Sequence, residues 1–218
     1  MRAANSSNRE VEDKEPQSAA HSPRTAGFAQ DCLFLSAVEV LSLIAYAPRI
    51  GFYWDDWIYL SFLKSCPSQG FWGLYGCLYS DAPTMHPRPV QIFCLAALYK
   101  LTGLHPLGYQ LFIAVLLVAT VSMFYIVLRE LQVPRLFALS VPMVYGLLPH
   151  YSTDRFWMAA SQSLVSMFFG FLCFYCILRS ASADRARMWW PSGAFVAFLV
   201  SAFAYEAFVP FVLFAPVL

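Results

Sequence analysis

Charged side chains are scarce in this sequence, which limits the solvents and partners that suit it. Only 12% of its 218 residues are Asp, Glu, Lys or Arg, and 59% are apolar, whereas a soluble domain is usually about 25% charged. The formal net charge is +1, so the chain exerts no general attraction on nucleic acid. We therefore predict a membrane protein without a nucleic-acid partner.

Cysteine is too sparse to make a disulfide scaffold. The chain has six cysteines, and most lie in apolar stretches, where a thiol behaves as a small hydrophobe. Cys173 and Cys176 share a helix face inside such a stretch, which argues against redox or zinc chemistry. Cys66 and Cys77 lie between the first two apolar stretches, and they pair if their compartment is oxidising. Both the paired and the free state of these two remain open.

Apolar residues gather in runs near the ~20 residues that a bilayer-spanning helix needs. The expected fold class is therefore all-α, a polytopic transmembrane helix bundle. Asp31 is the predicted N-cap of the first span and Pro48 its stop. The predicted spans cover residues 32–47, 107–128, 136–149, 156–178 and 189–205, with the start of a sixth at 207–218.

The remaining segments have distinct compositions. Residues 1–27 hold few large apolar side chains, so we predict a disordered cytoplasmic tail, followed by a transmembrane domain over residues 28–218. The loop at 49–106 is dense in Trp, Tyr and Phe, which is typical of residues at the membrane interface. We expect short amphipathic interfacial helices there, and a further short helix opened by Pro89 and closed by Gly103.

The distribution of basic residues predicts that the N-terminus faces the cytoplasm. In that orientation nine of the 14 Lys and Arg residues fall on the inner side and five on the outer side. The inner ones are Arg2, Arg9, Lys14, Arg24, Arg129, Arg135, Arg179, Arg185 and Arg187, and the outer ones are Arg49, Lys64, Arg88, Lys100 and Arg155.

Asp55 and Asp56 form an acidic pair directly after the first span, among aromatic residues. Partial burial raises a carboxyl pKa, and a neighbouring carboxylate raises one of the two further, which suits a general base. Adjacent helical residues point about 100° apart, so only one of them can face a reacting group. The alternative is that both merely cap the following helix, and spacing does not choose between these roles.

The acidic pair is followed, in order, by further short motifs. These are Arg88-Pro89-Val90, the stretch at 98–109, Leu148-Pro149-His150 and Ala204-Tyr205-Glu206-Ala207. Together they resemble the GT-C fold glycosyltransferases, such as protein O-mannosyltransferases and aminoarabinose transferases. The resemblance covers about residues 32–218, the N-terminal part of such an enzyme. Relatives carry a basic residue before the glutamate, where this chain has Tyr205.

The resemblance implies inverting sugar transfer from a polyprenyl-phosphate donor to an acceptor hydroxyl or amine on the outer membrane face. Asp55 would be the catalytic base, and Asp56 would orient the acceptor or help to hold a divalent cation. Arg88 would bind the lipid phosphate, since a guanidinium meets phosphate oxygens in a bidentate way. His150 and Glu206 would contact the substrate. The alternatives are lipid-headgroup snorkelling for Arg88 and a solvent-exposed loop position for His150.

The resemblance also implies partners and a location. The partners are a lipid-linked sugar donor, membrane lipids and a lipid, glycan or protein acceptor, and the location is a bacterial inner membrane with a periplasmic active face. A transporter-like or non-catalytic membrane protein is the alternative, because intramembrane acids and broken spans serve those classes too. One such acid is Glu39, which should face protein and form an internal hydrogen bond or ion pair. We also expect a fragment or truncated form, since GT-C enzymes continue through more spans.

Overall fold

The structure is a computed structural model that describes residues 23–148, 155–182 and 189–210. Within these ranges the chain is helical and contains no strand, which confirms the all-α prediction. Three helices are long and apolar enough to cross a membrane, judged by length and composition. They are α1 (Pro23–Ile44), α5 (Pro106–Glu130) and α8 (Ser161–Ser182).

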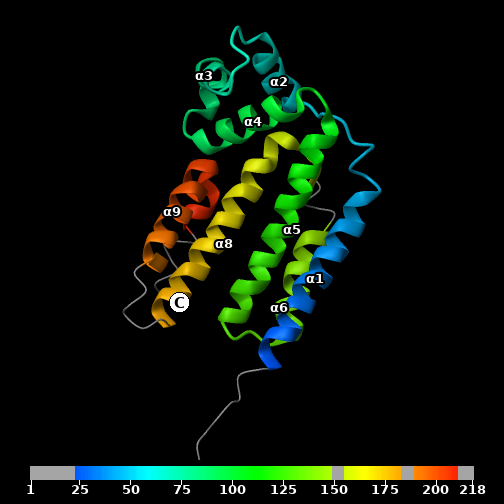
Figure 1. The fold of residues 1–218 in the computed structure, drawn as a ribbon, viewed down its shortest axis with the longest axis vertical. Coiled ribbons are helices and arrows are strands. Elements are labelled where there is room, and N and C mark those ends of the chain that lie inside the picture. The colour runs from blue at the N-terminus through cyan, green and yellow to red at the C-terminus, as the bar shows by residue number, and fades with distance from the viewer. Residues whose placement is uncertain (1–22, 149–154, 183–188, 211–218) are drawn as a thin grey trace, which may run out of the picture.

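Three shorter helices lie together across one end of the bundle, which we call the capped end (Figure 1). They are α2 (Asp55–Ser65), α3 (Phe71–Asp81) and α4 (Pro89–Thr102). Below them α5 packs against α1, α8 and α6 (Arg135–Leu147), and α8 packs against α9 (Trp189–Ala204). The start of α1 lies at the opposite end of the bundle (Figure 1).

Helix α4 begins and ends where the sequence predicts. Pro89 occupies its first turn, where a missing backbone N–H costs nothing. Gly103 follows the last residue with a φ of 58°, a conformation that favours glycine. The chain is thereby turned sharply into α5, whose first residue is Pro106.

Helix α1 begins earlier than predicted, and Asp31 is not its N-cap. The helix starts at Pro23, so residues 23–27 of the predicted tail are helical, while residues 1–22 lie outside the described ranges. Asp31 is buried in the middle of the helix, where it accepts hydrogen bonds from Arg135 at 2.6 and 2.9 Å and from the Tyr125 hydroxyl at 2.6 Å. These donors compensate the burial of the carboxylate, which lets the helix continue past it.

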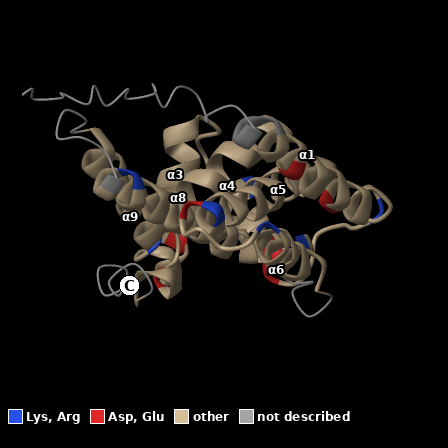
Figure 2. Cartoon of the chain, turned by 90° about the horizontal axis from the view of Figure 1, so that it is seen from below, with Lys and Arg blue, Asp and Glu red and all other residues tan. Residues whose placement is uncertain are grey.

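Seen from the end opposite α2–α4, the described helices carry few charged residues (Figure 2). Those at this end are largely paired across helices. Besides the Asp31–Arg135 pair, Arg179 of α8 lies 3.4 Å from Glu130 of α5. The helices α5, α6, α8 and α9 are mostly apolar along their sequences, as a membrane-embedded protein requires.

The capped end exposes many aromatic rings. Trp54 and Trp72 are 76% and 75% exposed, and Tyr53, Trp57 and Tyr79 are exposed as well. Rings with one polar edge favour the headgroup level of a bilayer. This exposure is what the predicted interfacial position of α2 and α3 requires, and the position itself stays a prediction.

A disulfide joins Cys66, at the end of α2, to Cys77 of α3. The sequence left open whether these two cysteines are paired or free, and in the structure they are paired. The bond closes a short loop, since the two residues are 11 positions apart. It therefore fixes α3 against α2 at the capped end.

We expect a reductant to lower the melting temperature of the purified protein, because opening this loop costs about 3 kcal/mol. A Cys66→Ser/Cys77→Ser double variant should melt at the lower temperature with or without reductant. The measurement is tryptophan fluorescence during heating in detergent. Equal melting of the oxidised and reduced wild-type protein would contradict the prediction.

Candidate functional site

Asp56 is the fixed member of the acidic pair. Its side chain is 0% exposed. Oδ2 accepts the backbone N–H of Tyr53 at 2.9 Å, and the Tyr53 carbonyl accepts the N–H of Asp56 at 2.9 Å. This reciprocal bonding resembles a capping box. Oδ1 accepts the N–H of Ala159 at 2.8 Å. Asp56 therefore fixes the chain that leads into α2 and also ties this helix to η3 (Met158–Ala160), the turn before α8.

The burial of Asp56 has an electrostatic consequence. Desolvation raises the pKa of its carboxyl above the usual value, while the N–H donors of Tyr53, Ala159 and Met158 oppose this rise. The neighbouring charge of Asp55 raises the Asp56 pKa slightly further. Since both oxygens of Asp56 already accept backbone N–H groups, this residue is built to position its surroundings rather than to contact a substrate.

A strained residue directly precedes the acidic pair. Trp54 has a φ of 36°, in a region that bulky side chains rarely adopt. Such a conformation costs about 1–3 kcal/mol and persists only where the surrounding structure holds it. Here the bonds between Tyr53 and Asp56 span the strained residue. The start of α2 is therefore held in one orientation.

Asp55 is the free member of the pair. It is half-buried and forms no hydrogen bond or ion pair with any residue that the structure describes. Tyr59 lies one helical turn further along α2. Burial raises the pKa of Tyr59, the charge of Asp55 raises it further, and Arg88 lowers it. Asp55 and Arg88 thus both lie within electrostatic range of the Tyr59 hydroxyl.

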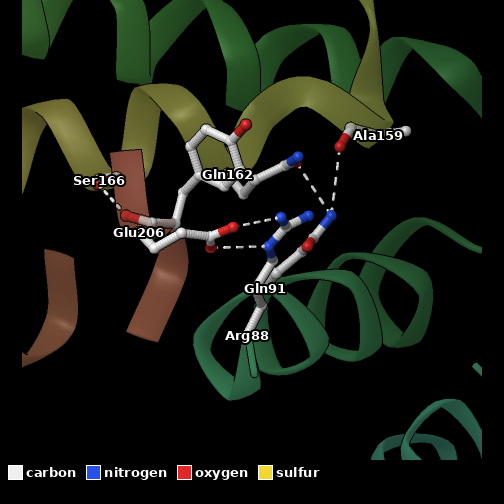
Figure 3. Close-up of polar contacts among 7 residues, drawn as sticks. Arg88, Gln91, Ala159, Gln162, Ser166 and Glu206 are labelled. Carbon is white, nitrogen blue, oxygen red and sulfur yellow. Dashed lines mark hydrogen bonds and ion pairs between the residues drawn. The ribbon is translucent and has the colours of Figure 1, made fainter. Parts of the chain in front are cut away.

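Arg88 and Glu206 are brought together from distant parts of the sequence. Arg88 precedes α4, and Glu206 begins the turn η4 (Glu206–Phe208) that follows α9. The guanidinium donates from Nη2 to Oε1 at 2.8 Å and from Nε to Oε2 at 3.2 Å (Figure 3). Its central carbon lies 4.6 Å from the ring centroid of Tyr205. Tyr205 therefore supports the cationic side chain of Arg88, which comes from the start of α4.

Two glutamines, which sequence reasoning missed, lie beside this ion pair (Figure 3). Gln91 lies one turn after Arg88 on α4 and is 4% exposed. Its Nε2 donates to the Ala159 carbonyl at 3.2 Å and to Gln162 Oε1 at 3.0 Å (Figure 3). Ala159 also donates its backbone N–H to Asp56, so one residue of η3 contacts both Gln91 and the acidic pair. The only signal in the sequence is a polar residue inside an apolar helix.

The segment that carries Glu206 is anchored on α8. Ser166 donates its hydroxyl to the Tyr205 carbonyl at 2.8 Å, and Ser201 of α9 donates to the Ser166 carbonyl at 2.8 Å. Both serines are buried. The end of α9 is therefore fixed where Tyr205 and Glu206 reach Arg88 (Figure 3).

An apolar groove of about 490 Å³ is lined in part by the first residues of α4. It lies between α3, α4, α8 and α9, and its lining includes Trp72, Pro89, Val90, Phe93, Phe169 and Phe203. Pro89 and Val90 directly follow Arg88 in the chain, so one wall of the groove is made by the helix turn that begins at this arginine. A ligand with an anionic head and a hydrocarbon chain has the matching chemistry.

The structure thus gathers four of the predicted residues, Asp55, Asp56, Arg88 and Glu206, at the capped end. We use the name capped-end site for these four together with their neighbours Tyr59, Gln91, Gln162 and Tyr205. The fifth predicted residue, His150, lies outside the described ranges. Among the described residues, no three His, Cys, Asp or Glu side chains gather as metal ligands. Both oxygens of Asp56 are engaged by backbone N–H groups, which leaves the predicted role of Asp56 in holding a divalent cation without support from its surroundings.

Comparison with known proteins gives no relative from which a role could be transferred. No protein family, no curated protein and no solved structure matches this chain. The assignment of a function therefore depends on the chemistry of the capped-end site and on the motifs in the sequence.

Proposed function

We propose that this chain is the N-terminal part of a GT-C-type membrane glycosyltransferase that uses a polyprenyl-phosphate-linked sugar. The observation that carries the proposal is the unequal state of the acidic pair. Asp56 is locked by two backbone N–H groups, whereas its neighbour Asp55 is half-buried and free of partners among the described residues. A positioned carboxylate without a partner is the arrangement that a general base needs.

The reaction would be a single displacement at the anomeric carbon of the sugar. The acceptor oxygen or nitrogen attacks that carbon and gives its proton to Asp55. The bond from the anomeric carbon to the phosphate oxygen breaks, and its electron pair leaves with the lipid phosphate. Attack from the face opposite the leaving group inverts the configuration. Asp56 holds α2, and with it Asp55, in place during this step.

The departing phosphate gains negative charge and needs a cation. Arg88 is suited to this task, because a guanidinium offers two parallel N–H groups and always stays charged. Its pKa is raised further, chiefly by the hydrogen bond to Glu206. The adjacent groove would take the first part of the polyprenyl chain. Tyr59, in electrostatic range of both Asp55 and Arg88, would lie beside the sugar.

The proposed setting is a membrane with the capped end on the outer face. The described inner-side arginines Arg129, Arg135 and Arg179 belong to the opposite end, as the excess of basic residues on the cytoplasmic side requires. A disulfide at the capped end suits an oxidising compartment. Both features support a bacterial inner membrane with a periplasmic active face. In this setting α6 and α9 would be additional short spans.

The test is sugar transfer by membranes that contain this chain or a longer protein that includes it. A panel of radiolabelled polyprenyl-phosphate sugars is supplied, and label is followed into lipid, glycan and protein fractions. Transfer above membranes lacking the chain supports the proposal. Absence of transfer from every donor, with the protein present at normal levels, would refute it.

One observation favours the transporter-like alternative. Glu39 of α1 is 0% exposed, and neither of its oxygens has a hydrogen-bond partner within the described part of the chain. Glu39 thus faces protein, as predicted, but the predicted internal hydrogen bond is not there. Its carboxylate lies against Gly146 of α6, where any larger residue would collide with it. Acids without hydrogen-bond partners inside membrane proteins often mark ion or proton paths.

We expect Glu39→Gln to leave sugar transfer unchanged, because Glu39 contacts no residue of the capped-end site. The substitution keeps the shape of the side chain and removes its charge. Transfer is measured in the assay above, alongside proton uptake by reconstituted vesicles under a pH gradient. If the wild-type protein takes up protons but transfers no sugar, and Glu39→Gln abolishes the proton uptake, the protein would instead be identified as a transporter.

A further inference from the structure

The ion pair between Arg88 and Glu206 occupies one face of the proposed phosphate site. Nε and Nη2 of Arg88 donate to the two oxygens of the Glu206 carboxylate at 3.2 and 2.8 Å. This is the fork geometry in which a guanidinium also binds two oxygens of a phosphate. A phosphate that uses this bidentate face and the Glu206 carboxylate therefore exclude each other.

The two partners of the ion pair are held unequally. The Arg88 side chain is 26% exposed, and its guanidinium stacks on the Tyr205 ring. The Glu206 side chain is 61% exposed, and besides Arg88 its carboxylate accepts a hydrogen bond only from the backbone N–H of Glu206 itself among the described residues. Glu206 also lies in a turn of only three residues. The arginine is anchored, and the glutamate is the partner that can move.

The charges favour an exchange of anions at this position. The hydrogen bonds from Arg88 hold the pKa of Glu206 below its usual value, so the carboxylate is ionised at neutral pH. An arriving phosphate competes for the same guanidinium and repels the carboxylate. An exposed ion pair contributes little net stability, so its rupture is a small obstacle for an anionic phosphate ligand that gains the same cation.

We propose that Glu206 is a built-in competitor for the anion site on Arg88, and that it leaves Arg88 when the phosphate of a lipid-linked ligand binds. The nature of that ligand rests on the proposed function. Glu206 then opposes ligand binding in the resting protein, whereas the resemblance to glycosyltransferases implies a residue that contributes a substrate contact. Removal of the Glu206 charge should raise the affinity for the phosphate ligand if Glu206 is a competitor, and should lower it if Glu206 is a substrate contact.

The test is the binding of radiolabelled farnesyl phosphate to the full chain in phosphatidylcholine nanodiscs. Glu206→Gln should bind about two- to sixfold more tightly than wild type, the factor that corresponds to an exposed ion pair of up to about 1 kcal/mol. Arg88→Gln should bind at least about tenfold more weakly, because it loses a charge-assisted bidentate contact. Glu130→Gln is the matched control, since it breaks the ion pair with Arg179 at the opposite end, and it should bind like wild type.

Each result has a distinct meaning. If the wild-type protein binds farnesyl phosphate and Glu206→Gln binds it equally or more weakly, the inference is overturned and the proposed function still stands. If the wild-type chain and all variants bind no farnesyl phosphate, the assignment of a lipid-phosphate ligand and the inference about Glu206 are both refuted. If phosphatidylglycerol in the nanodiscs abolishes binding to Glu206→Gln, the site serves bulk anionic lipid and the ligand assignment is overturned. Should Arg88→Gln elute as an aggregate, Arg88→Lys keeps the charge without the fork and must still bind more weakly than wild type.

Discussion

Asp55→Asn should abolish sugar transfer, with a fall of about 10²–10⁴-fold, the range that a positioned general base contributes. The amide has the shape of the carboxylate but cannot accept the proton of the acceptor. Asp55 forms no hydrogen bond with the described residues, so the substitution breaks no contact that holds the fold. The rate should therefore fall while the protein level and the melting temperature stay at their wild-type values.

Asp81→Asn is the matched control for this experiment. Asp81 is an exposed carboxylate at the end of α3, also at the capped end, and its substitution changes the net charge by the same amount. It should retain wild-type transfer. If Asp55→Asn transfers sugar as fast as Asp81→Asn across the donor panel, Asp55 is not the base, and the transporter-like and non-catalytic alternatives gain weight.

Local sequence signals located the helix boundaries where one residue type decides them. Pro89 and Gly103 set the limits of α4 through a missing N–H and a positive φ, and both effects depend on the residue alone. The start of α1 was missed for the opposite reason. Asp31 resembles a cap in the sequence, but its place inside the helix depends on Arg135, which is 104 residues away.

The candidate site shows the same division between local and distant causes. The adjacent carboxylates were visible in the sequence as a pair, but their spacing could not tell which one is free. That distinction depends on the N–H of Ala159, 103 residues after Asp56. Likewise Arg88 and Glu206 were each singled out, and only the fold makes them partners across 118 residues.

The buried member of the acidic pair should affect stability more than any other residue of the site. Asp56→Ala removes the acceptor of the buried Ala159 N–H and of the partly buried Tyr53 N–H, and an unsatisfied buried group costs about 1–3 kcal/mol. We expect a total loss of about 2–5 kcal/mol in the free energy of unfolding. Asp56→Asn should lose less, since its amide oxygen still accepts one of the two bonds.

The loss should begin at α2, because Asp56 ties this helix to the turn before α8 and spans the strained Trp54. Heating followed by tryptophan fluorescence measures the global effect, and trypsin cleavage after the exposed Lys64 of α2 measures local opening. Cleavage should speed up in the order wild type, Asp56→Asn, Asp56→Ala, with Asp81→Ala as the wild-type-like control. Transfer should fall in the same order, because a loosened α2 no longer aims Asp55. An Asp56→Ala protein as stable and as protected as wild type would show that the buried carboxylate does not hold the capped end together, and the division of the acidic pair into a holder and a base would fail with it.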